Sequence, residues 1–171
     1  MSRREVVTFF SEWDNEAAKT AQLMRALPPD QYDFRPDPKG RTLGQLAWHL
    51  AEIEGYMSWS VEAGKFEVDA KIPGLERPRT VAELAPGYER VHRESVARLA
   101  GLTPEDFLRT TPFFGGRMVP IGTILWNALL RHLVHHRGQL VLMCRLAGGR
   151  PPGMFGPTRE EMEETAGRPK A

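Results

Sequence analysis

The sequence predicts an all-α protein, a four-helix bundle with long crossover loops. Three observations support this class: four stretches repeat apolar residues every three or four positions, capping signals precede them, and segments rich in proline and glycine separate them. An apolar share of 41% with 26% charged residues is the composition of a globular chain. We place a single domain at residues 1–171, with residues 157–171 as a peripheral tail.

The first two helices are predicted from apolar stripes. The first spans residues 2–27 and stops at the segment PPD. A loop rich in proline and glycine follows, after which Thr42 is a candidate N-cap and Gln45, three residues later, completes a capping box. The second helix therefore starts at Leu43 and runs to about Glu62.

The third helix repeats this signal. Thr80 and Glu83 form its capping box, and the apolar pattern continues to Gly101. Pro86 lies within the pattern, so we expect a kink or a delayed start, because proline lacks an amide donor and clashes with the preceding turn. The segment TTPFFGGRMV, with its two glycines, predicts a short β-hairpin before the last core helix.

The fourth core helix is predicted to begin at Pro120 and to end in LAGG, where a glycine can adopt the left-handed conformation. A short helix capped by Thr158 and Glu161 is expected in the tail. Because two of the connections between core helices are long, neighbouring helices can run parallel, and simple up-down-up-down order is not required.

Charge, hydropathy and cysteine content exclude several classes of function. With 23 basic and 22 acidic residues the net charge is +1, which is not the basic excess of a protein that binds nucleic acid or an anionic membrane. No apolar run approaches the roughly 20 residues that span a bilayer, and the N-terminus lacks an apolar signal core. The only cysteine, Cys144, is interpreted as a small core residue. We expect a cytoplasmic protein.

Histidines give the first indication of a site. On a helical wheel His132 and His136, four positions apart in RHLVHHRGQL, face the core. His49 lies on the flank of the second helix's apolar stripe and can face inward too. Three imidazoles from two helices could hold a metal ion and leave a coordination position for water or substrate. The alternative is that they are neutral, hydrogen-bonded core residues, and their spacing leaves both readings open.

The remaining histidines carry weaker signals. His135 lies near the edge of the stripe, where it could support the site or face solvent. His92, within the charged stretch ERVHRES, is predicted to be a solvated side chain. Leu133 follows His132 where a zincin-type protease would have its glutamate base, which argues against that class.

Two segments resemble the DinB-like superfamily, helical-bundle metalloproteins that include bacterial thiol S-transferases and relatives of mycothiol-dependent isomerases. They are YDFRPDPKGRTLGQLAWHLAEIE and LLRHLVHHRGQLVLMCRLAGGRPP. The resemblance implies up-down-down-up helix order, the homodimer frequent in the family, and one divalent metal ion per chain, which is zinc, nickel or another divalent ion. It also implies that the metal ligands are the histidine of the WHLAE segment and two positions four apart on the last core helix. These map onto His49, His132 and His136.

Two polar residues near these histidines are candidates for supporting roles. Glu52, one turn after His49, could orient that histidine or act as general base, or it could face solvent. Gln139 could hydrogen-bond a ligand imidazole or a metal-bound water, or be satisfied by the backbone.

Other side chains allow two interpretations each. Tyr56 and Trp48 could line a pocket or belong to the core. The arginines Arg137, Arg145 and Arg159 could bind a substrate carboxylate, although surface ion pairing is the simpler expectation.

The leading functional hypothesis is a metal-dependent enzyme that transfers a low-molecular-weight thiol to an electrophilic small molecule. A bound ion would lower the pKa of the thiol, as it does for bound water. A metal-dependent hydrolase, with water in the thiol's place, needs the same site and is an alternative. A non-catalytic metal-binding bundle related to stress, or a structural dimer whose histidines bind nothing, would be proteins of a different class.

Overall fold

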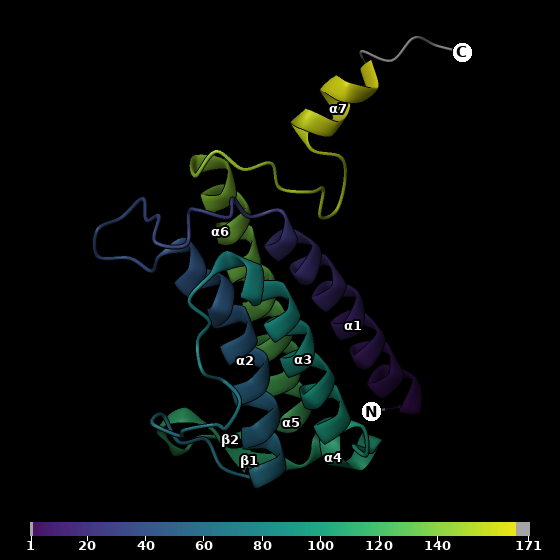
Figure 1. The fold of residues 1–171 in the computed structure, drawn as a ribbon. Coiled ribbons are helices and arrows are strands. Elements are labelled where there is room, and N and C mark those ends of the chain that lie inside the picture. Colours follow the sequence, from purple (N-terminus) through teal and green to yellow (C-terminus); the bar gives the residue numbers. More distant parts are fainter. Residues whose placement is uncertain (1, 167–171) are drawn as a thin grey trace.

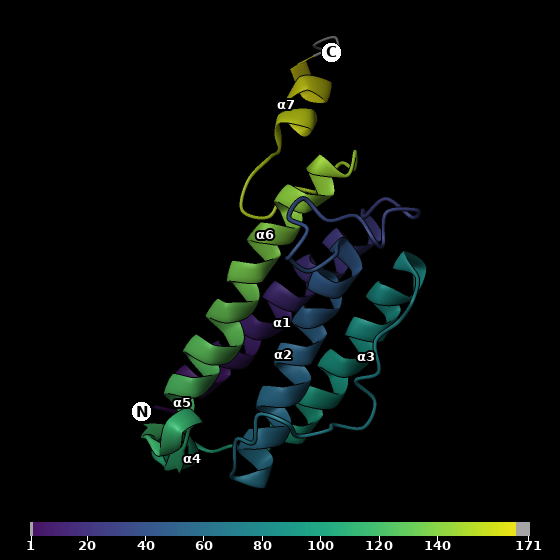
Figure 2. The same cartoon turned by 90° about the vertical axis from the view of Figure 1, so that its left-hand side faces the viewer.

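The computed structural model describes residues 2–166, which form a mostly helical fold with one small sheet. Four long helices lie side by side in Figures 1 and 2. In Figure 1, α1 and α6 run upward, whereas α2 and α3 run downward. Helix α2 packs against both α3 and α6, and α1 packs against α3. These helices are α1 (Arg3–Arg25), α2 (Leu43–Ala63), α3 (Val81–Leu99) and α6 (His132–Leu146).

The predicted capping boxes set the starts of α2 and α3. At α2, the Gln45 amide donates to Thr42 Oγ1 over 3.1 Å, and the Thr42 amide donates to Gln45 Oε1 over 2.9 Å. At α3, the Thr80 amide and hydroxyl both donate to Glu83 Oε2, over 3.2 Å and 2.6 Å. Pro86 lies inside α3, yet α3 begins at Val81, so the expectation of a delayed start is wrong: the cap at Thr80 sets the first turn ahead of the proline.

A small sheet closes the lower end of the helices. Strands β1 (Thr110–Pro112) and β2 (Met118–Pro120) pair antiparallel, which confirms the predicted hairpin. The 3₁₀ turn between them holds its two glycines at positive φ, 76° and 78°. The short helix α4 (Pro104–Leu108) was not predicted, although the sequence TPED contains its capping box, formed by Thr103 and Asp106.

The last core helix is not the single α-helix that the sequence predicts. It is divided into α5 (Ile121–Ile124), a π-helical segment η2 (Leu125–Arg131) and α6. Gly148, with φ 84°, follows α6 as expected for LAGG. A π-helical turn closes i→i+5 hydrogen bonds, and a pattern of apolar residues read at the α-helical period contains no sign of it.

The tail forms the predicted short helix, α7 (Arg159–Ala166), which stands apart from the four long helices in both views (Figures 1 and 2). The Glu161 amide donates to Thr158 Oγ1 over 3.2 Å, so the predicted cap is confirmed. The part of the predicted tail at 167–171 lies outside the described residues. Within residues 2–166, no helix has both the length and the apolar character that crossing a bilayer requires.

Trp48, whose interpretation was open, and Cys144 both belong to the core. Trp48 is buried, and its indole Nε1 donates to the carbonyl of Leu75 over 3.0 Å, which attaches the α2–α3 connection to the helices. Cys144 is buried, and its thiol contacts the carbonyl of Ala26, as expected for a small core residue.

Arg137 corrects the sequence analysis, since it is neither a surface residue nor available to a substrate. It is buried, and its guanidinium donates to the backbone carbonyl of Glu16 over 2.8 Å and to the Glu16 carboxylate. Lys19 Nζ also lies 2.6 Å from that carboxylate. Burial alone raises the pKa of Glu16, but Lys19 and Arg137 together hold it below its ordinary value.

Arg145 and Arg159 form the expected exposed ion pairs, both with Glu160.

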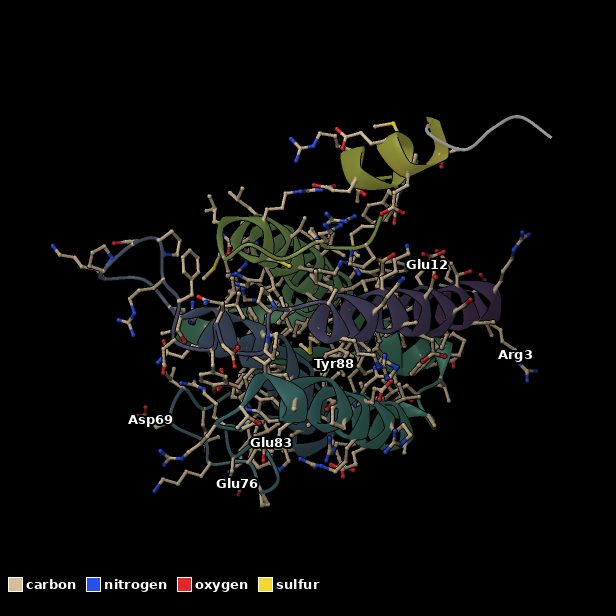
Figure 3. All side chains as sticks on the ribbon, turned by 45° about the horizontal axis from the view of Figure 1, so that its top comes forward. Arg3, Glu12, Asp69, Glu76, Glu83 and Tyr88 are labelled. Carbon is tan, nitrogen blue, oxygen red and sulfur yellow. The ribbon has the colours of Figure 1, made fainter. Side chains whose placement is uncertain are left out.

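His92 is a second correction. Its side chain is only 14% exposed, and its Nδ1 donates to Glu54 over 2.8 Å while its Nε2 donates to Asp14 over 3.0 Å. The Tyr88 hydroxyl donates to the same buried Glu54. Figure 3 shows Tyr88 among the helices, in contrast to Asp69 on the outer connection. The sequence around His92 shows only its charged neighbours on α3, whereas its partners come from α1 and α2.

The environment of His92 predicts a pH-dependent contribution to stability. Burial alone lowers its pKa, but Glu54 and Asp14 raise it above the ordinary value of 6.5. A raised folded-state pKa gives stabilisation that is complete below 6.5 and is lost as pH rises through the folded-state pKa. We therefore expect His92→Gln to lower the free energy of unfolding most at about pH 6 and progressively less toward about pH 9.

Urea unfolding of both proteins across this range measures the effect. Taking the difference between wild type and variant cancels the titration of the other histidines. A difference that grows with pH would contradict the prediction.

Candidate metal centre

Three histidine side chains meet between α2 and α6. One ring nitrogen from each histidine lies within 4.8 Å of the corresponding nitrogens of the other two, and all three side chains are half-buried. Nε2 of His132 is 2.9 Å from Nε2 of His136. The ring of His49 has its centroid 4.9 Å from that of His136 and 5.9 Å from that of His132. The structure thus brings together the three residues that the sequence selected as candidate ligands.

Local structure explains the arrangement. His132 and His136 are one turn apart on α6, so their side chains share a face, and that face packs against α2, which carries His49. The π-helical segment η2 ends at Arg131, directly before His132. Single π-helical turns within α-helices are frequent at functional sites, and here one sets the rotation of the helix that presents two of the three rings.

Two of the three rings have a hydrogen bond that orients them. His49 Nδ1 donates to Glu52 Oε2 over 3.1 Å, and His136 Nδ1 donates to Gln139 Oε1 over 2.7 Å. Metal-binding histidines usually donate their second nitrogen to a carboxylate, an amide or a backbone carbonyl in this way.

Burial affects the charge of the rings. It is the main reason why the pKa values of His132 and His136 lie below the ordinary value, and the proximity of His49 and His135 lowers both further. A lowered pKa favours the neutral imidazole, which is the form that binds a metal. Three imidazole nitrogens from two helices fit a divalent transition-metal ion, and this group of residues could hold one.

Glu52 lies beside the cluster and is hydrogen-bonded to His49, as expected if it has a supporting role and does not simply face solvent. Its other oxygen, Oε1, accepts from the Arg77 guanidinium over 2.8 Å. Burial alone raises the pKa of Glu52, but the hydrogen bonds from His49 and Arg77 bring it below the ordinary value. Arg77 was missed by the sequence analysis because it lies in the long α2–α3 connection, where no periodicity indicates which residues approach the site.

Gln139 and His135 form the exposed side of the cluster. Besides accepting from His136, Gln139 donates through Nε2 to His135 Nε2 over 3.2 Å. His135 is exposed and is not a member of the three-nitrogen group. Gln139 is therefore hydrogen-bonded to a candidate ligand imidazole, that of His136, which is one of the roles expected from the sequence.

A cavity of about 640 Å³ opens beside the histidines. His49 and His132 line one end of it, and Tyr56 lines its wall, with the phenol hydroxyl donating to the carbonyl of Glu67 over 3.0 Å. A volume of this size is typical of small-molecule sites.

The orienting hydrogen bonds predict the effect of removing them. We expect Glu52→Ala and Gln139→Ala each to weaken affinity for Zn²⁺ by about 10- to 100-fold, because His49 and His136 would lose the bonds that orient their rings. Competition with a chromogenic chelator measures the affinity. Glu62→Ala on the same helix as Glu52 should leave it unchanged; equal losses in all three variants would indicate a general effect on folding instead.

Fold and site together define a small, mostly helical protein with a three-histidine candidate metal centre between two helices. The model of the DinB family matches residues 1–169, and the chain belongs to this family. This confirms the resemblance on which the sequence analysis relied.

Relatives cover most of the chain. It is 28% identical over 153 residues to an uncharacterized protein of Bacillus subtilis (strain 168), YrdA, across 90% of this chain and 89% of YrdA. A crystal structure of a DinB-like protein from Bacillus cereus ATCC 10987 is similar with a TM-score of 0.71 and 30% identity, covering 85% of this chain and 94% of that one. A second DinB-like protein, YjoA of Bacillus subtilis, shares the fold with a TM-score of 0.69 at 23% identity, covering 89% of this chain and 99% of its own.

Proposed function

We propose that this chain is a metal-dependent enzyme that transfers a low-molecular-weight thiol to an electrophilic small molecule. The observation that carries the proposal is that two of the three candidate ligands, His49 and His132, line a cavity large enough for a substrate. A structural metal site is closed by its protein ligands, whereas three ligands beside a cavity leave a coordination position for a reactant.

Within this proposal the residues have distinct roles. His49, His132 and His136 hold a divalent ion, which when bound acts as a Lewis acid toward a thiol or water. Glu52 has both oxygens engaged, by His49 and Arg77, and a lowered pKa, which makes it a weak base. Its proposed role is therefore to orient His49, not to accept a proton.

The transfer itself is a substitution at carbon. A bond forms between the thiol sulfur and the electrophilic carbon, the bond from that carbon to its leaving group breaks, and the leaving group keeps the electron pair. The thiol proton passes to solvent. Apolar residues on the cavity walls limit the access of water to the reacting atoms.

We also propose that the chain is an up-down-down-up four-helix bundle, a cytoplasmic homodimer with one zinc or nickel ion per chain. The directions of the four long helices in Figure 1 support the first part, and three imidazole ligands suit either metal. Light scattering after size exclusion tests the dimer, and elemental mass spectrometry of protein purified without tag or chelator tests the metal.

Activity is tested with the protein loaded with zinc or nickel, glutathione, cysteine or coenzyme A as thiol, and 1-chloro-2,4-dinitrobenzene as electrophile. Mass spectrometry of the products should show a thioether conjugate that metal-free protein and His136→Ala do not form. Hydrolysis of ester substrates without conjugation would favour the hydrolase. A fully loaded protein with no turnover would favour a non-catalytic metal-binding protein.

A further inference from the structure

The walls of the cavity beside the histidines are apolar and come from three parts of the chain. Helix α2 forms one wall, the α2–α3 connection lies over it, and the turn between β1 and β2 closes the end away from the histidines. The apolar lining residues that carry the argument are Ile53, Tyr56, Met57, Ile72, Leu75 and Phe114.

Aromatic rings dominate the end formed by the β-turn. Tyr56 and Phe114 are nearly parallel, with an interplanar angle of 6° and centroids 6.1 Å apart. Phe66 contacts both rings at its edges. Although it is apolar, Phe114 is 43% exposed, so part of its ring is available to a bound molecule. Flat aromatic faces favour a flat aromatic ligand through offset stacking or edge-to-face contact.

Three charged residues line the cavity, Glu52, Lys71 and Glu76. Glu52, beside His49, is paired with the Arg77 guanidinium. Lys71 and Glu76 are exposed, and Figure 3 shows Glu76 on the outside of the molecule. The six apolar lining residues offer no charge that could bind a charged ligand body, and burying an unpaired charge among them would be costly.

We infer that this cavity binds the uncharged aromatic part of the substrate, with the reacting carbon toward His49 and His132 and the ring between Ile72 and Phe114. The inference rests on the proposed function for the identity of this substrate as the electrophile. A neutral aromatic molecule should also bind here whether or not metal is present, because the apolar lining residues that would hold its ring are not among the candidate ligands.

The test is equilibrium binding of N-phenyl-1-naphthylamine, a neutral aromatic probe whose fluorescence rises in apolar surroundings, to the full chain with and without zinc. We expect saturable binding of one probe per chain. Phe114→Ala should weaken it about 3- to 10-fold through loss of ring contact. Ile72→Glu should weaken it more than about 10-fold by placing a charge in the wall. Leu142→Ala, which removes an apolar side chain on α6 that is more exposed than Phe114 and lies outside the cavity, should have no effect.

Circular dichroism shows whether each variant is folded, and only folded variants are compared. His136→Ala removes a candidate ligand that does not line the cavity, and it should lose metal but bind the probe as wild type does. Absence of saturable binding, or equal weakening by Leu142→Ala and Phe114→Ala, would overturn the inference. Probe binding without metal binding or conjugation would support the aromatic site while refuting the proposed function.

Discussion

Alanine in place of any one of His49, His132 or His136 is expected to weaken Zn²⁺ binding by more than about 100-fold. Loss of a partner that only orients a ligand costs up to about that factor, and each of these substitutions removes a ligand nitrogen itself. Elemental mass spectrometry of protein loaded with zinc and then dialysed should find about one ion per wild-type chain and a large deficit in every variant.

Two other histidines provide matched controls. His135→Ala changes an exposed residue on the same helix that is not in the three-nitrogen group, and His92→Gln changes a histidine on α3. Both should retain the ion. If wild-type protein binds no metal after loading with zinc or nickel, the cluster is a group of hydrogen-bonded histidines and the proposed function falls with it.

The second large effect concerns the buried ion pair. Glu16→Leu leaves the buried Arg137 guanidinium without its carboxylate, so we expect the free energy of unfolding to fall by about 3–5 kcal/mol. Replacing both partners, as Glu16→Leu with Arg137→Met, removes the unpaired charge and should restore most of this stability. Chemical denaturation of the metal-free proteins measures both changes.

Glu12→Leu is the control for the effect of a new apolar residue on α1. Glu12 is exposed, so this change should stay within about 0.5 kcal/mol of wild type. A double variant as unstable as the single one would mean that Arg137 contributes mainly through packing rather than through its charge.

Local signals account for what the sequence could predict. Thr42 with Gln45 and Thr80 with Glu83 set helix starts through contacts three residues apart, which any reader of the sequence can find. The pair His132 and His136 is equally local, because one helical turn places both on one face. The position of His49 on its own helix showed only that this side chain can face inward. The family resemblance was needed to group it with the other two histidines.

Long-range polar contacts account for what was missed. A charged residue on a helix is ordinarily expected to face solvent, and Arg137 reaches Glu16 across 121 positions of the sequence. The position of its partner Glu16 did indicate burial. Glu16 lies three residues after Trp13 and four before Thr20, so it belongs to the buried stripe of α1. An acidic residue within an apolar stripe predicts a buried partner, but it does not name one.

The π-helical segment before His132 lets the chain hold one residue that an ordinary α-helix could not hold without turning its continuation. Because an α-helix turns by about 100° per residue, one extra residue in an α-helical path would rotate α6 by that angle relative to α5 and the sheet. A π-helical turn closes i→i+5 hydrogen bonds and takes up one residue more, so η2 leaves the histidine pair facing α2. A one-residue deletion at the exposed Asn127 should therefore let η2 close as an ordinary α-helix while the histidine pair stays in place. Relatives that share this cluster are then expected to differ in length by one residue within this segment more readily than between the two histidines.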